Sequence, residues 1–190
     1  MEVLEGLRGR RAVRDYLDEP VSRDLIGAVI DSAVWAPSGM NRQPWRFLVL
    51  EGRDVLARCS AAAKRLMLEE ATRRPELAAV RGMLEQPDFN IFYNAPALVI
   101  VCATEPDEMA VKDCCLAAQT LMLAAHAQGL GSCWIGFAEL WLNSPEAKAW
   151  LGMADGLRPV APIILGRPAA AVAPPDRRPA DVEFVRLGGI

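Results

Sequence analysis

The chain of 190 residues is 52% hydrophobic but only 6% aromatic, and its formal net charge at pH 7 is −3. This length favours one domain, residues 1–190, with a sizeable core, and the small negative charge gives no general reason to bind nucleic acid or anionic lipid. Because no apolar run approaches the ~18 residues of a membrane span and the N-terminus lacks an apolar signal core, we expect a cytoplasmic protein with no membrane partner.

The N-terminal part of the sequence predicts two helices and a strand. Residues 2–9 predict a short helix that runs into a cluster of arginines. Ser22 is placed to cap a second helix, whose apolar residues follow helical spacing and which Pro37 ends. Residues 45–50 predict a strand, which Gly52 stops.

The middle of the sequence predicts the core of the domain. Residues 53–86 are highly charged and predict one or two helices broken near a proline. The unbroken apolar run 97–103 predicts a strand covered on both faces. Residues 110–128 are apolar almost all round, so this helix must be buried on nearly every side. In so short a chain, a partner subunit is the expected source of some of that cover. Gly129 and Gly131 end the helix.

The C-terminal part predicts shorter elements and a long tail. Residues 134–135 begin a short strand or extended turn, 144–152 form a capped helix, and 160–165 form a strand. The tail 167–180 is too rich in proline to pack as a helix or strand. Residues 182–187 (with Val182, Phe184, Val185 and Leu187) predict a last short strand. Few strands among many helices indicate an α+β or α/β domain.

Several common catalytic sites are absent from the sequence. The number of cysteines is odd and no CxxC pair occurs, which argues against a disulfide framework and against a zinc site. Cys133 lies beside a glycine-rich turn and is interpreted as a small buried hydrophobe. The only histidine, His126, is interpreted as a core or interface residue, so no metal site is expected. Because no phosphate loop, nucleophile elbow or dinucleotide fingerprint occurs at a strand-to-helix junction, an enzyme of this sequence depends on a cofactor for its reactivity.

Three segments, far apart in the sequence, have an unusual composition for their positions. Residues 10–14, RRAVR, form a strong local anion site, although a solvated basic turn at a helix end is the commoner interpretation of such a cluster alone. Residues 37–45, PSGMNRQPW, are either an ordinary turn or a set of hydrogen-bonding groups for a ligand. Residues 129–137, GLGSCWIGF, either let backbone approach a flat ligand or form a helix C-cap and a core strand.

Taken together, these segments resemble the nitroreductase family of FMN-dependent oxidoreductases. The resemblance rests on RRAVRDY near the start, APSGMNRQPWRFLVL after the second helix, and the apolar helix leading into GLGSCWIG. The later ILGRPA and Arg177-Arg178-Pro179 add support. These motifs match in order and spacing and cover most of the chain.

The resemblance implies an α+β fold with a central, mostly antiparallel sheet flanked by helices, in an intertwined homodimer with two FMN sites at the interface. Each site would be built from both chains. It implies the following cofactor-binding residues: Arg10, Arg11, Ala12, Arg14, Pro37, Ser38, Gly39, Asn41, Trp134, Ile135, Gly136 and Arg177.

The first motif carries the charge of the implied site. Arg10 and Arg11 would meet the phosphate and ribityl end of FMN. The family usually has serine where this chain has Ala12, so only backbone can serve there. Arg14 matches a basic residue near the flavin pyrimidine, where a cation stabilises negative charge at N1 and O2 of the reduced flavin.

The other two motifs would surround the flavin ring. Residues 37–41 would reach across to a flavin held mainly by the other subunit, with hydroxyl and amide groups for hydrogen bonding. Residues 134–136 would run along the isoalloxazine with backbone N–H groups near N5. The family often has two glycines after Ile135 and this chain has one, so the donor to N5 stays open. Arg177 matches a late basic residue of the phosphate site, with Arg178 as the alternative.

The implied activity is hydride transfer from NADH or NADPH through FMN N5 to an oxidised acceptor such as a nitroaromatic, quinone or enone. It follows a ping-pong mechanism in which no side chain serves as a catalytic acid or base. Residues 60–95 are expected to shape the acceptor pocket. A flavin-binding storage or sensor protein without significant turnover is the alternative, and a cofactor-free structural module is a third possibility. Rapid bleaching of bound flavin by NADH or NADPH would favour the enzyme over the storage or sensor protein. A colourless protein that ignores added FMN would favour the structural module.

Overall fold

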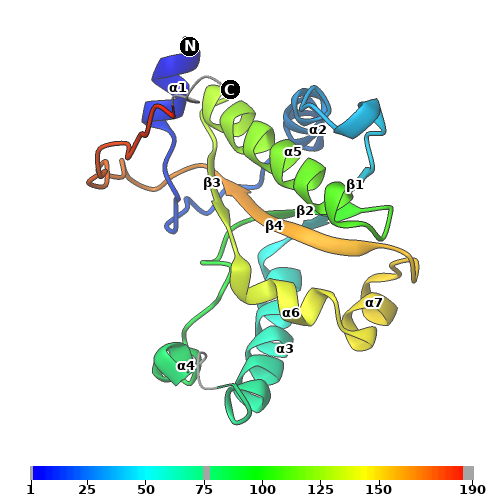
Figure 1. Cartoon of the computed structure of the whole chain (residues 1–190). Helices are drawn as coiled ribbons and strands as arrows, with labels where there is room; N and C mark the ends of the chain where they lie inside the picture. Colours follow the sequence, from blue (N-terminus) through cyan, green and yellow to red (C-terminus); the bar gives the residue numbers. More distant parts are fainter. Residues whose placement is uncertain (1, 75–77, 186–190) are drawn as a thin grey trace.

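The computed structural model describes residues 2–74 and 78–185, and these form a three-layer arrangement with a sheet between two sets of helices (Figure 1). The sheet contains β1 (Trp45–Glu51), β2 (Ala97–Ala103), β3 (Gly131–Trp134) and β4 (Arg158–Gly166). Their order is β1-β2-β4-β3, and every neighbouring pair is antiparallel. The α+β class and the antiparallel sheet predicted from the sequence are therefore confirmed.

The central strand β2 explains how the core divides into two. All its residues are buried, as its unbroken apolar run predicts, and alternate side chains point to opposite faces. Val99 and Val101 pack into one hydrophobic cluster with α2 (Arg23–Ala33) and α5 (Glu108–Ala127). Leu98 and Ile100 pack into the other cluster. The helices of this second face are α3 (Arg53–Ala71), α4 (Ala78–Leu84), α6 (Glu139–Leu142) and α7 (Pro145–Leu151).

The helix ends follow the capping residues seen in the sequence. The Ser22 hydroxyl accepts a hydrogen bond from the Leu25 amide at the start of α2, and the Ser144 hydroxyl accepts one from Ala147 at the start of α7. Gly152 takes the left-handed conformation that ends α7. The short first helix, α1 (Val3–Gly9), lies beside one end of α5 (Figure 1).

Two predicted strands need correction. The strand expected to begin at Trp134 instead ends there, because Gly131 to Trp134 pair with β4 and Gly131 fits closely against Val13. No last strand forms in residues 181–185, whose side chains are all exposed, because a strand needs a neighbour to accept its hydrogen bonds and this segment has none in the described chain. Leu187 lies outside the described residues.

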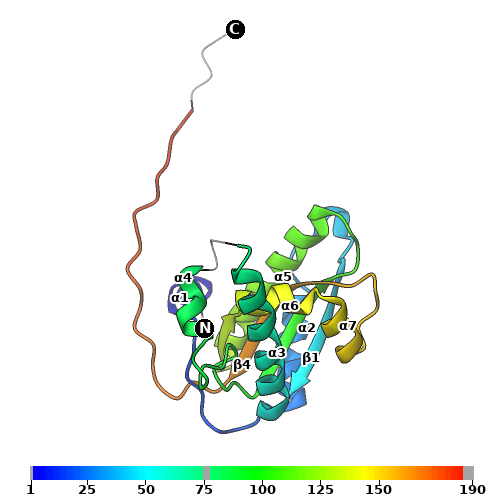
Figure 2. The ribbon, with the colours of Figure 1, turned by 90° about the horizontal axis from the view of Figure 1, so that it is seen from below.

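After β4, residues 167–169 form hydrogen bonds with residues 15–17. The chain then continues as an extended tail without helix or strand (Figure 2), and its part up to Arg177 lies beside residues 10–14. This confirms that residues 167–180 form neither helix nor strand. No helix among the described residues has the length and apolar character needed to cross a lipid bilayer.

Helix α5 is less completely covered than its sequence predicts. One of its faces packs on the sheet and on α2. On the opposite side, Met109 is 47% exposed and Leu116 is 46% exposed. Lys112 and Gln119 lie on the same face of the helix and are also exposed. The single chain therefore leaves a partly apolar stripe of α5 facing solvent.

Candidate functional site

The arginine motif lies along the edge of the sheet, next to β3. Ala12 forms a parallel bridge with Ser132, and the Val13 amide donates a hydrogen bond of 3.0 Å to the Ser132 carbonyl oxygen. Gly131 makes this approach possible, because a Cβ at this position would lie 2.8 Å from the Cβ of Val13. Two of the sequence motifs, residues 10–14 and 129–136, are thus brought side by side.

Arg14 lines two of the cavities that open along this edge. The first is about 270 Å³ and is lined by arginines and small residues; its predicted site residues are Arg10, Arg11, Ala12, Arg14 and Arg177. The second is about 320 Å³ and largely apolar; its lining is Arg14, Ile91, Tyr93, Cys133, Trp134, Ile135, Gly136 and Phe137. Arg178 is not among the residues that line the first cavity.

The arginines of the first cavity carry uncompensated charge. None of Arg10, Arg11, Arg14 and Arg177 forms an ion pair with a carboxylate within the part of the chain that the structure describes. The Arg11 guanidinium donates to the carbonyl oxygens of Arg8 and Arg10, which fixes its position without neutralising it. Clustered guanidinium groups of this kind bind phosphate well, since they offer bidentate hydrogen bonds.

Tyr93 is a site residue that the sequence motifs did not reveal. The Arg14 guanidinium carbon lies 5.7 Å from the centroid of the Tyr93 ring, within the range of a cation–π contact. Tyr93 and Asn94 both adopt the left-handed conformation, with φ of 51° and 53°, which is strained for a bulky residue and often marks a functional loop. The sequence analysis included Tyr93 only within the broad range, residues 60–95, that was expected to shape the acceptor pocket.

Cys133 borders the apolar cavity, but its environment keeps it a thiol. Burial raises the pKa of Cys133 above its usual value, although Arg14 and Arg10 act in the opposite direction. Its sulfur also donates a weak hydrogen bond to the Trp134 carbonyl oxygen. A raised pKa disfavours the nucleophilic thiolate, which agrees with the interpretation of Cys133 as a structural residue.

The remaining motif, residues 37–45, lies elsewhere. Its residues 37–43 form a turn, called the rigid turn below, around the short helix η1 (Gly39–Asn41). Met40, Asn41 and Gln43 all have left-handed backbone, with φ of 54°, 56° and 52°. The Ser38 hydroxyl accepts a hydrogen bond of 3.0 Å from the Gln43 amide across this turn. Asn41 is exposed, and its carbonyl Oδ1 accepts from the Gln43 side chain at 3.2 Å.

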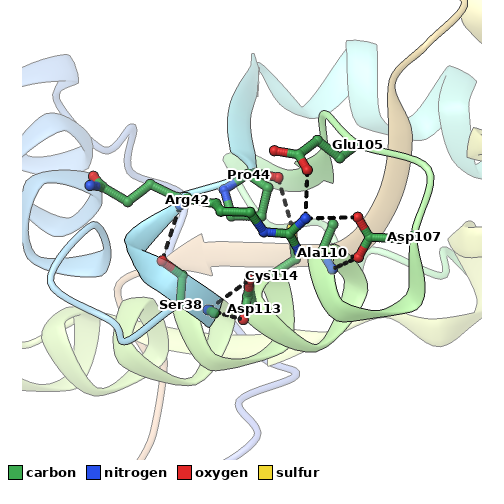
Figure 3. Close-up of polar contacts among 10 residues, drawn as sticks. Ser38, Arg42, Pro44, Glu105, Asp107, Ala110, Asp113 and Cys114 are labelled. Atoms are coloured by element: carbon green, nitrogen blue, oxygen red, sulfur yellow. Dashed lines mark hydrogen bonds and ion pairs between the residues drawn. The ribbon is translucent and has the colours of Figure 1, made fainter.

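Charged groups from the start of α5 hold this turn in place (Figure 3). Both carboxylate oxygens of Asp113 accept from the Gly39 amide, at 3.1 and 3.2 Å. Arg42 pairs with Glu105 at 2.8 Å and with Asp107 at 3.0 Å. Asp107 also caps α5, and the hydrogen bond from Arg42 is the main reason that its pKa falls to about 2.

Within one chain, the turn and the arginine motif are far apart. The turn is attached to α5 at Asp113, whereas Gly9, just before the arginines, packs on His126 near the other end of that helix. At about 1.5 Å per residue, these two points are separated by roughly 20 Å along α5. The structure therefore brings residues 10–14, 134–136 and Arg177 together, and leaves residues 37–41 outside that group.

The arrangement suits a ligand with an anionic end and a flat, apolar body. The unpaired guanidinium groups would hold the anion, and the apolar cavity that begins at Arg14 would hold the ring. Among the described residues, no three histidine, cysteine or carboxylate side chains gather as they would around a metal ion.

The chain is similar to known proteins in sequence and in fold. A protein of Methanothermobacter thermautotrophicus that carries the name NADH dehydrogenase/NAD(P)H nitroreductase is 30% identical over 89% of this chain and 78% of its own. The crystal structure of a nitroreductase with bound FMN from Bacteroides fragilis superposes with a TM-score of 0.84, at 27% identity, over 98% of this chain and 100% of the other. A nitroreductase with bound FMN from Desulfitobacterium hafniense gives a TM-score of 0.78, at 26% identity, over 96% and 97% of the two chains.

The family model described as the nitroreductase family matches residues 7–167, a span that includes the arginine motif, the rigid turn and β3. The resemblance first noted in three short motifs thus extends over the whole fold, and the chain belongs to the nitroreductase family.

Proposed function

We propose that this protein is an FMN-dependent oxidoreductase that passes a hydride from NADH or NADPH to an oxidised acceptor such as a nitroaromatic, quinone or enone, in a ping-pong sequence. The observation that carries the proposal is the pair of cavities joined at Arg14, one lined by unpaired arginines and the other apolar. Membership of the nitroreductase family supports it. When bound, FMN supplies the hydride-accepting and hydride-donating atom, N5.

The residues of this chain bind and orient the cofactor. Arg10, Arg11 and Arg177 hold the phosphate end, and Ala12 offers only its backbone there. Arg14 provides positive charge between the two cavities, where it stabilises negative charge on a reduced flavin. Trp134, Ile135 and Gly136 line the apolar cavity that would receive the ring. The Ile135 amide already donates to the Pro162 carbonyl oxygen, so it is not the donor to N5.

We also propose that the protein is a homodimer in which residues 37–41 complete the flavin site of the partner. A separation of roughly 20 Å along α5 keeps this turn from the arginines of its own chain. Exposed apolar side chains occur just after α2, in the turn and on α5: Val34, Trp35, Met40, Met109 and Leu116. Such a group on the surface of one chain is typical of a protein–protein interface.

The activity is tested by purifying the protein, recording its visible spectrum and adding NADH or NADPH without oxygen. Bound FMN should bleach rapidly with at least one nicotinamide and regain its colour when a nitroaromatic or quinone is added. Bound flavin that neither nicotinamide bleaches would favour storage or sensing instead. A colourless protein that ignores added FMN would overturn the flavin site itself.

The shared site is tested by a mixed dimer, with Arg10→Ala in one chain and Asn41→Ala in the other. If each site takes its arginines from one chain and Asn41 from the other, one site carries both changes and the other carries none. The intact site should then bind FMN as in the wild type, so that about half the sites fill at low FMN, and added FMN should raise the melting temperature of the dimer. Equal damage at both sites, or a stable FMN-loaded monomer in sedimentation, would contradict the shared site.

A further inference from the structure

The rigid turn has one feature that its exposed position does not require, a buried carboxylate beneath it. Asp113 is only 3% exposed and lies among the apolar residues of α5. Burying a carboxylate is unfavourable unless it is hydrogen-bonded. Within the described chain, the hydrogen bonds to its side chain come from one group, the Gly39 amide, which lies 3.1 and 3.2 Å from its two oxygens.

This pairing joins parts of the chain that are distant in sequence and is specific to the turn. Asp113 lies in the second turn of α5, where it does not cap the helix; that role belongs to Asp107. The fold of α5 therefore does not depend on a carboxylate at this position. The carboxylate does determine where the Gly39 amide points, and with it the direction of the chain that follows.

The chain that follows is strained. Met40, Asn41 and Gln43 have left-handed backbone. Asparagine adopts it readily, but Met40 and Gln43 keep it only where the surrounding structure enforces it. The hydrogen bond between Ser38 and Gln43 closes the turn itself. The turn is attached to α5 and the segment before it by Asp113 at one end and by Arg42, with its two carboxylate partners, at the other. The Asp113 carboxylate is buried, whereas the side chains of Arg42 and its two partners are 32–44% exposed, so water weakens the second attachment more than the first.

We propose that Asp113 is the positioning residue for residues 38–41 of the flavin site, and that it acts through the Gly39 amide. This inference rests on the proposed function, because the turn is taken to meet a flavin. Asp113 itself does not touch the cofactor. Its contribution is to hold Ser38 and Asn41 in one geometry before FMN arrives, so that binding does not have to order the turn.

The test compares Asp113→Ala with Asp113→Asn, which keeps one acceptor oxygen, and with Asp31→Ala, which removes an exposed carboxylate from α2. Two readouts are needed: hydrogen exchange of the 37–43 segment in the protein without FMN, and the dissociation constant of FMN. Asp113→Ala should speed exchange of the Gly39 amide and weaken FMN binding about tenfold, while exchange in β2 stays unchanged. Asp113→Asn should fall between this variant and the wild type. Arg42→Ala should weaken binding only about twofold, and Asp31→Ala should change neither readout.

The outcomes separate this inference from the proposed function. Faster exchange of the turn with unchanged FMN affinity would overturn the positioning role, as would unchanged exchange in Asp113→Ala. Faster exchange throughout β2 as well as the turn would show a general loss of structure and would also overturn it. A wild-type protein that binds no FMN would overturn the proposed function and this role together, and the exchange measurement would still decide whether Asp113 holds the turn.

Discussion

The charged side chains near the two ends of α5 differ in whether they are paired. At the end near His126, the guanidinium groups of Arg10, Arg11, Arg14 and Arg177 line a cavity and form no ion pair with a carboxylate in the described chain. At the other end, Arg42 is paired with Glu105 and Asp107, and the buried Asp113 is paired with the Gly39 amide.

Unpaired charged groups are suited to bind a ligand, and paired ones are suited to fix the position of a backbone segment. An unpaired cluster of positive charge gains most when an anion arrives, because nothing in the protein has to be displaced first. Paired charges have already satisfied one another, so they fix the position of a backbone segment and offer little to a ligand. The proposed flavin site uses both kinds of group, because a cofactor site requires attraction for the ligand and a preorganised shape.

The largest expected effect comes from removing charge at the binding end. Arg10→Ala should weaken FMN binding about tenfold or more, because a hydrogen bond to a charged group contributes ~1.5–3 kcal/mol. Titration of flavin fluorescence measures the dissociation constant. Arg58→Ala, which removes an exposed positive charge from α3, is the matched control and should leave affinity within about twofold. Equal affinity in Arg10→Ala and the wild type would show that this arginine does not bind the phosphate.

A smaller effect should follow when the same end is distorted without any change of charge. In Gly131→Ala, the new Cβ would lie 2.8 to 2.9 Å from three carbon atoms of Val13, so the arginine motif must shift away from β3. Overpacking of this kind destabilises a protein by roughly 1–3 kcal/mol. Denaturant unfolding should show that loss, and FMN affinity should fall with it.

Gly27→Ala is the matched control for this change. It adds the same methyl group within α2, where no atom lies within 4 Å of the new carbon, and should raise stability by roughly 0.5–1 kcal/mol, because alanine favours a helix. If Gly131→Ala were as stable as the wild type and bound FMN equally well, close packing of the motif on β3 would not matter for the site.

Local patterns in the sequence predicted most of the elements but not how the two ends of α5 differ. The caps at Ser22 and Ser144 and the buried run of β2 depend on neighbouring residues, which the sequence displays. The pairing of Asp113 with Gly39 joins residues far apart in the chain, and only one local signal pointed to it: a carboxylate in an apolar helix needs a partner.

Tyr93 was missed as a site residue, and the last strand was predicted but does not form. The left-handed backbone that brings Tyr93 to Arg14 has no signature in a tyrosine or its neighbours. The strand predicted at the C-terminus has suitable residues, such as Val182 and Phe184, but strand propensity cannot supply the neighbour that a strand needs. In both cases the deciding contact is not local.

The smallest expected effect concerns Cys133, which lies at the binding end but takes no part in binding charge. Burial raises the pKa of its thiol, with Arg14 and Arg10 only partly opposing this, so the group should stay protonated at neutral pH and supply neither a nucleophile nor a charge. Cys133→Ser should therefore leave both the rate of flavin reduction by NADH or NADPH and its pH dependence between about pH 6 and 8 as in the wild type. Stopped-flow bleaching of the bound flavin measures both. A variant that retains FMN but is no longer reduced, or a pH dependence of the wild type that disappears in the variant, would mean that the arginines at this end activate a thiolate as well as binding an anion.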